Sequence, residues 1–169
     1  TSQVIRTADD ERLWTIDYSV TPWRQRFTLR DLDGSVLRVF AADADYHGPW
    51  TVEQDYIRRD GALLATVKIG ESGQPETWHQ HPDHLGTPRM QTSPRNGSNQ
   101  VCSIFNSYFP FGERLTPELP ADRMQFTGHE RDVNGEGETA DLDYMHARYC
   151  SLLTGRFLSI DPSESSADK

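Results

Sequence analysis

The chain has 169 residues, and its 35% hydrophobic and 10% aromatic content excludes a chain that is disordered throughout. Its formal net charge of −9 argues against nucleic acid as a partner, because phosphate binding requires a concentrated basic surface. No apolar run approaches the ~18 residues of a membrane helix, so we expect no membrane insertion.

Alternating apolar residues predict β-strands from the start of the chain. Positions 14–18 alternate Trp, Ile and Tyr with polar residues, and positions 27–29 and 37–39 continue the pattern. Asp33-Gly34 stands between the last two runs. Asp-Gly between alternating runs predicts a tight hairpin, because such a turn requires positive φ and Gly adopts it at little cost.

The same pattern recurs further along the chain. Asp60-Gly61 separates strand-like runs at 52–59 and 63–69, and Asn96-Gly97 separates runs at 87–92 and 101–105. Asn134-Gly135 marks a candidate fourth turn. The sequence therefore predicts an all-β chain of about eight to twelve short strands, arranged as consecutive antiparallel β-hairpins.

Aromatic residues and cysteines complete this prediction. We expect the four Trp, six Tyr and seven Phe to supply the core, since each buries a large apolar area. Cys102 and Cys150 both lie in strand-like segments, which leaves either two buried thiols or one disulfide. Of these alternatives we favour buried thiols.

Three short motifs occur in order along the chain from residue 81 onward. They read HPDHLGTPR at His81–Arg89, YFPFGE at Tyr108–Glu113 and TGRFLSIDP at Thr154–Pro162. Together with Asp141–Cys150, and with Leu32-Asp33-Gly34 as a YD-like turn, they resemble the Rhs/YD-repeat protein family. The similarity is to its Rhs repeat-associated core domain, and it covers residues 1–162, with 163–169 as a flexible tail.

The resemblance implies a container. In this family, consecutive β-hairpins coil into a hollow shell around a C-terminal cargo, as in polymorphic toxins and toxin-complex cocoons. The chain would then be a structural, encapsulating fragment of a bacterial shell that is secreted or at the cell surface. Its partners would be the remaining shell strands of the parent polypeptide and a C-terminal toxin. Open sheet edges would also allow homo-oligomers, and no cofactor is implied.

The resemblance also assigns structural roles to the motif residues. Phe109, Phe111 and Phe157 are expected to pack between strands, Pro110 and Gly112 to shape a turn, and Asp83 to cap one. The full set of structural motif residues is Asp83, His84, Gly86, Pro88, Arg89, Phe109, Pro110, Phe111, Gly112, Gly155, Arg156, Phe157, Asp161 and Pro162.

The family's self-cleavage is not expected of this chain. Family cores usually continue to a second Asp-Pro motif, where cleavage releases the cargo, and this sequence stops at Lys169. Asp161 could form a carboxyl pair with Asp141, Asp143 or Asp168, but no spacing rule selects a partner. We therefore expect Asp161 to be a turn residue and the chain to be structural rather than enzymatic.

Two other functions are kept as alternatives. His79, His81, Asp83 and His84 lie within six residues and have the side chains of a Zn or Ni site, as in a small metal-dependent hydrolase. Against this, Pro82 breaks the strand, and Asp83-His84 belongs to the first motif.

The remaining alternative is a surface module for glycan binding or adhesion. Trp50, Tyr108 and Tyr144 would supply stacking rings for a sugar, although we favour buried aromatic residues. The charged run Glu130-Arg131-Asp132 is interpreted as solvated ion pairs of little energetic value.

Overall fold

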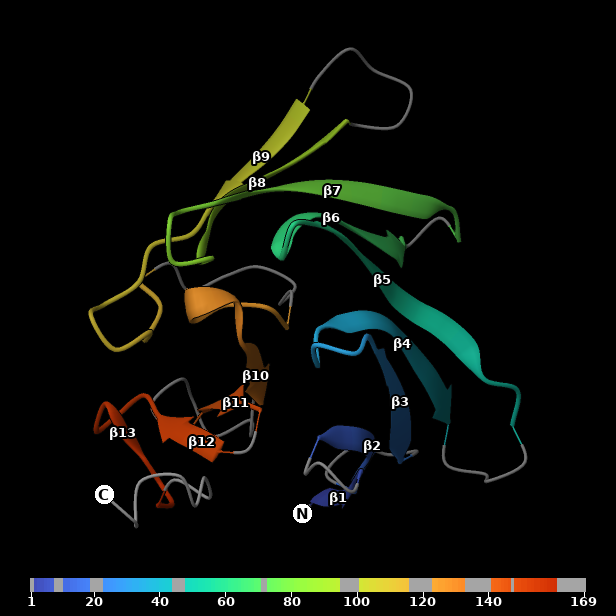
Figure 1. Ribbon diagram of the computed structural model, residues 1–169. Helices are drawn as coiled ribbons and strands as arrows, with labels where there is room; N and C mark the ends of the chain where they lie inside the picture. The colour runs from blue at the N-terminus through green and yellow to red at the C-terminus, as the bar shows by residue number, and fades with distance from the viewer. Residues whose placement is uncertain are drawn as a thin grey trace. The chain divides into compact units, whose positions relative to one another are not determined.

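The computed structural model describes residues 2–7, 11–18, 23–43, 48–70, 73–94, 101–115, 123–132, 141–146 and 148–160. Its contacts divide the chain into two compact units, each considered by itself (Figure 1). The first unit comprises Thr1–Asp83 and Arg89–Phe105, and the second comprises His84–Pro88 and Asn106–Lys169. Among the described residues, no helix is long and apolar enough to cross a membrane.

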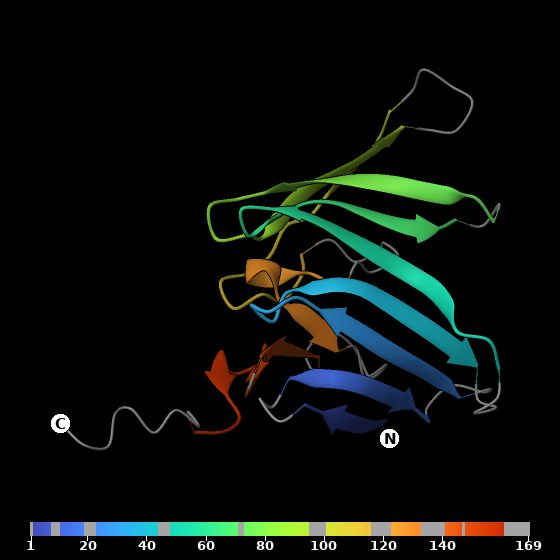
Figure 2. The ribbon, with the colours of Figure 1, turned by 45° about the vertical axis from the view of Figure 1, so that its right-hand side comes forward.

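The first unit is a nine-stranded antiparallel meander in which each strand pairs with the next (Figure 2). The strands are β1 (Ser2–Arg6), β2 (Arg12–Asp17), β3 (Arg24–Arg30), β4 (Val36–Asp43), β5 (Thr51–Arg59), β6 (Ala62–Ile69), β7 (Pro75–Pro82), β8 (Pro88–Pro94) and β9 (Val101–Phe105). The prediction of an all-β chain built from consecutive hairpins is confirmed. Within the described ranges the sheet is not a closed barrel, because β1 and β9 are its two ends.

The predicted Asp-Gly hairpins are present. Asp60 and Gly61 have φ values of 52° and 78°, the positive values that a tight hairpin turn requires, and Gly34 has a φ of 78°. Asn96-Gly97 and Asn134-Gly135 lie outside the described residues, although β8 and β9 pair across the former. The described residues contain thirteen strands, one more than the upper bound expected.

In each of two successive hairpins of the first unit, an arginine forms a hydrogen bond to the preceding hairpin. Arg30 donates from Nε to Arg12 O at 3.2 Å and from Nη1 to Gly34 O at 2.9 Å. Arg58 repeats this arrangement with Val36 O at 3.5 Å and Gly61 O at 3.3 Å. In both strands the arginine directly follows an aliphatic residue, and the register shifts between the two. The two hairpins therefore repeat the same local structure, although no strict sequence repeat marks it.

The buried residues of the nine-stranded sheet are mostly small or polar, so the prediction of an aromatic core is wrong for this unit. Thr66, Gln80 and Gln91 are buried and form a ladder across β6, β7 and β8. Gln91 Nε2 donates to Gln80 Oε1 at 3.0 Å, and Gln80 Nε2 donates to Thr66 Oγ1 at 3.1 Å. These amide contacts satisfy polar groups that would otherwise be buried at a cost.

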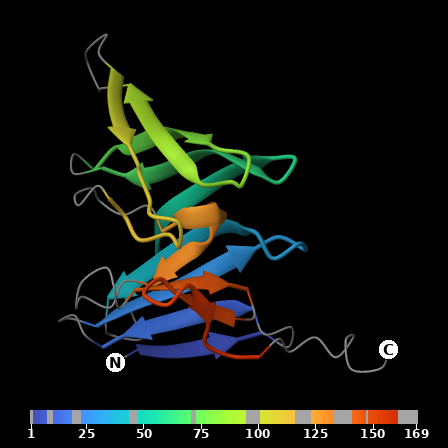
Figure 3. The same ribbon diagram turned by 90° about the vertical axis from the view of Figure 1, so that its left-hand side faces the viewer.

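The second unit contains a four-stranded antiparallel sheet, in the order β10-β11-β12-β13 (Figure 3, orange to red). Its strands are β10 (Glu130–Asp132), β11 (Leu142–Met145), β12 (Arg148–Ser151) and β13 (Arg156–Phe157), preceded by a 3-10 turn, η1 (Phe126–Gly128). Its described residues include the buried apolar side chains of Met124, Tyr144 and Leu152. Charged side chains are buried with them, and these define the candidate site.

Candidate functional site

One row of side chains crosses the sheet of the second unit. Arg131 lies opposite Asp143, Asp143 opposite Cys150, and Cys150 opposite Phe157 in the antiparallel registers. Arg131 binds the Asp143 carboxylate with two nitrogens: Nε lies 2.8 Å from Oδ1 and Nη2 lies 3.2 Å from Oδ2. Both side chains are only 1% exposed. The interpretation of Glu130-Arg131-Asp132 as solvated ion pairs is therefore wrong for Arg131.

The Arg131 guanidinium also reaches the second motif. Its Nη2 donates to Gly112 O at 2.8 Å, while its buried Nη1 has no hydrogen-bond partner. Burial raises the pKa of Asp143, and the hydrogen bond and charge of Arg131 act in the opposite direction. A guanidinium remains charged in a protein, so this pair fixes a permanent cation inside the unit.

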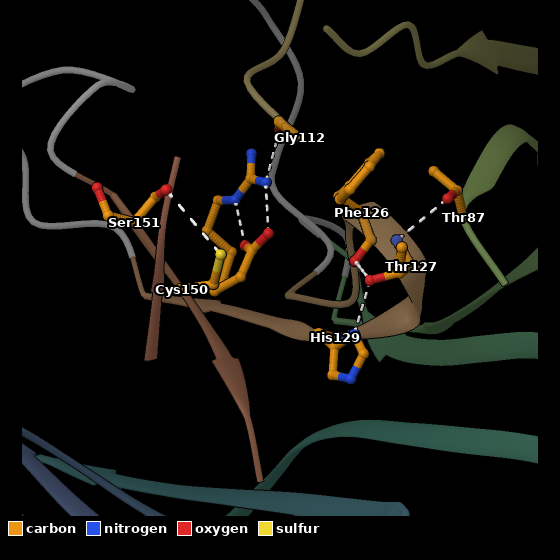
Figure 4. Close-up of polar contacts among 9 residues, drawn as sticks. Thr87, Gly112, Phe126, Thr127, His129, Cys150 and Ser151 are labelled. Carbon is orange, nitrogen blue, oxygen red and sulfur yellow. Dashed lines mark hydrogen bonds and ion pairs between the residues drawn. The ribbon is translucent and has the colours of Figure 1, made fainter. Parts of the chain in front are cut away.

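The turn beside this pair has a strained backbone. Thr127 has a φ of 53°, a left-handed conformation that β-branched residues rarely adopt. Thr87 of the first motif holds it there, because its buried Oγ1 accepts a hydrogen bond from Thr127 N at 3.1 Å (Figure 4). Thr127 Oγ1 donates to Phe126 O at 2.8 Å. Strain of this kind persists where the surrounding contacts enforce it.

His129 completes this cluster. Its Nδ1 lies 2.8 Å from Thr127 Oγ1, and that hydroxyl already donates to Phe126 O, so Nδ1 carries the proton and donates. The His129 ring meets the edge of His146 at a centroid distance of 6.0 Å. Burial lowers the pKa of His129, and the neighbouring His146 lowers it further. Both effects disfavour the protonated form of His129.

Glycines of the three motifs allow close contacts in the second unit. A Cβ on Gly112 would lie 2.9 Å from the Phe126 ring, and one on Gly155 would lie 2.6 Å from the Phe111 ring. A Cβ on Gly128 would lie 3.2 Å from Gly86 O. The motif positions thus act as packing and turn positions around η1 and its neighbours.

Two charged residues of the first motif, Asp83 and Arg89, belong to the first unit and form an ion pair. Arg89 Nε donates to Asp83 Oδ2 at 2.9 Å, which ties the two ends of the segment between β7 and β8. Asp83 therefore acts through an ion pair across the loop. The intervening residue Pro88 is buried, while His84 is exposed.

The aromatic motif residues do not fill a core. Phe111 is 60% exposed although its ring contacts Gly155, and Phe109 and Phe157 are also exposed. Arg148 stacks on Phe157 with its guanidinium carbon 3.8 Å from the ring centroid. The sequence predicts that these rings pack between strands. Phe111 and Phe157 each make a contact on one face, and the packing of Phe109 stays a prediction. Pro110 and Arg156 are exposed, and Asp161 and Pro162 lie outside the described residues.

The histidine-rich segment does not assemble a metal site. His81 Nε2 lies 2.9 Å from Thr92 Oγ1, and Asp83 is paired with Arg89. Among the described residues, no group of three or more His, Cys, Asp or Glu side chains could hold a metal ion. The metal-dependent alternative therefore has no support from this geometry.

The two cysteines are free thiols, and neither is fully buried. Cys102 is exposed and Cys150 is partly exposed, so the expectation of buried thiols is wrong. Burial raises the pKa of Cys150, and the Asp143 carboxylate raises it further, which disfavours a nucleophilic thiolate. Tyr144 is buried against Tyr149, so its ring is not available for the glycan stacking kept as an alternative.

Neither a protein-family model nor a curated protein matches the chain. The contacts themselves identify the candidate site as the cluster of Thr87, Thr127, His129, Arg131 and Asp143. Sequence reasoning missed this cluster because its members are separated by up to 56 positions, from 87 to 143. The available signal was the first motif, whose Thr87 stands between the two expected residues Gly86 and Pro88.

Proposed function

We propose that the chain is a wall segment of an Rhs-type shell that houses a C-terminal toxin or effector. The observation that supports this most directly is the nine-stranded meander in strict chain order. Such a sheet grows by adding hairpins at its edge, which is how a repeat architecture encloses a volume. The repeated Arg30 and Arg58 contacts fit this role, since they join each hairpin to the one before it.

The three motifs would then hold the second unit in a fixed conformation. Their glycines and Thr87 contact η1 and its neighbours, and the Arg131–Asp143 pair is locked to Gly112. The proposed partners are neighbouring shell strands and the enclosed polypeptide, in a bacterial product that is secreted or displayed on the surface. This proposal needs no cofactor.

Electron microscopy of the parent polypeptide tests the proposal. We expect the meander to continue into further hairpins and to form part of a closed wall around a density for the cargo. An open, isolated sheet beside a separately folded effector would overturn the proposed function. The Arg58→Ala variant adds a specific check, because the wall should loosen at the β4–β5 junction while the rest of the sheet is kept.

A further inference from the structure

The last strand of the meander has the properties of an edge that accepts another strand. β9 lies at one end of the sheet order and pairs with β8 in the described part of the chain. Its sequence, VCSIF, contains no charged residue and no proline. Its register with β8 runs through five consecutive pairs without a shift. Natural edge strands usually carry charges, prolines or bulges that prevent such pairing.

The opposite edge of the same sheet shows these protective features. β1 has a register shift between Ile5 and Arg6, and it places the Arg6 charge at the end of the strand. A bulge twists an edge away from a flat partner, and a charge opposes apolar contact. The two edges therefore differ, and only β9 presents a regular, uncharged ladder.

The exposed side chains of β9 indicate which kind of strand could pair with it. Val101, Ser103 and Phe105 share one face by the two-residue period of a strand, and Val101 and Phe105 are 63% and 65% exposed. We propose that β9 is a strand-addition site that binds β9 of a second copy of this chain in antiparallel orientation, with Ser103 opposite Ser103 of the partner subunit.

This register makes the strand complementary to itself. With Ser103 on the two-fold axis, Val101 lies opposite Phe105 of the partner subunit, and the same apolar pair occurs twice. Because VCSIF carries no charge, no like charges meet across the axis. The inference does not depend on the proposed shell.

Sedimentation velocity of the full chain over a concentration series gives the first test, with Val101→Lys as the disrupting variant. Leu64→Lys is the matched control, because Leu64 is also an exposed aliphatic residue but lies on the interior strand β6. We expect a dimer whose dissociation constant rises by about tenfold in Val101→Lys, since symmetry removes two cross-strand pairs. The Leu64→Lys control should dimerise with the same dissociation constant as the unsubstituted chain.

Disulfide trapping tests the register independently of stability. In a Cys102→Ser background, Ser103→Cys places two thiols directly opposite each other, where cross-strand Cβ atoms lie about 4.5–5.5 Å apart. We expect a covalent dimer from Ser103→Cys and little from Val101→Cys, whose thiol would face Phe105 of the partner subunit. A monomer at every concentration, a dimer insensitive to Val101→Lys, or equal trapping at both positions would each overturn the proposal.

Discussion

Arg131 and Asp143 lie directly opposite each other on neighbouring strands, and two guanidinium nitrogens contact the carboxylate at 2.8 Å and 3.2 Å. Because both side chains are almost fully buried, neither can exchange its partner for water without opening the unit. The same guanidinium binds Gly112 O, so one ion pair connects the sheet to the second motif.

Removing one side of this pair should destabilise the second unit strongly. Asp143→Asn leaves a buried guanidinium without its counter-charge, and we expect a loss of about 3–5 kcal/mol. Asp132→Asn is the control, since the Arg123–Asp132 contact is longer, at 3.4 Å, and more exposed, so its loss should cost less than about 1 kcal/mol. Amide hydrogen exchange in β11 measures both effects, and similar values for the two variants would refute this account.

Gly112 should be intolerant of a side chain for steric reasons. Gly86 and Gly112 both have left-handed φ values, of 83° and 92°, so alanine at either position costs about 1–2 kcal/mol in backbone strain. Gly112→Ala additionally forces a Cβ to within 2.9 Å of the Phe126 ring, whereas a Cβ on Gly86 makes ordinary contacts at 3.6 Å. Thermal unfolding should therefore show the larger loss for Gly112→Ala, and equal losses would show that the ring moves freely.

Thr87 should matter through its hydroxyl. Thr87→Val keeps the shape of the side chain but leaves the half-buried Thr127 N without its acceptor, and we expect a loss of about 1 kcal/mol, near the lower end of the cost of an unsatisfied donor. Thr87→Ser retains the oxygen and should recover most of the stability. Exchange of the Thr127 amide measures the local opening directly, and unchanged protection in Thr87→Val would contradict the role assigned to this contact.

The second unit should lose stability under mildly acidic conditions because of His129. Burial and the nearby His146 lower the pKa of His129, while Asp143, Glu130 and the Thr127 backbone act in the opposite direction. The unfolded chain then binds more protons than the folded one as pH falls below about 6.5, the ordinary pKa of histidine. The contribution of neutral His129 is complete above that pH and is lost below it.

His129→Gln should flatten this pH dependence of the unfolding free energy. His84→Gln is the control, because His84 is exposed in the same unit. Denaturant unfolding at neutral and mildly acidic pH gives the change in unfolding free energy with pH for each variant. If the unfolding free energy of His129→Gln changes with pH as steeply as that of the unsubstituted chain, another group controls the acid sensitivity.

The local chemistry of the hairpins was predictable, and their packing was not. Asp60-Gly61 identifies its turn because the required φ values are a property of two adjacent residues. Which side chains are buried depends on which surface the rest of the chain covers, and residue type does not decide it. Phe111 is exposed, whereas Thr66 and Gln80 are buried. The Arg131–Asp143 pair depends on the register between β10 and β11, which no local pattern specifies.

Protease protection of a C-terminal cargo in the parent polypeptide tests the central claim most directly. If the meander is part of a closed wall, the cargo should resist digestion until the wall is opened. Arg58→Ala, which removes the contacts to Val36 O and Gly61 O, should then expose the cargo at lower denaturant concentrations than the unsubstituted polypeptide does. A cargo that is digested at the same rate with and without the intact wall would contradict the claim that this chain encloses its contents.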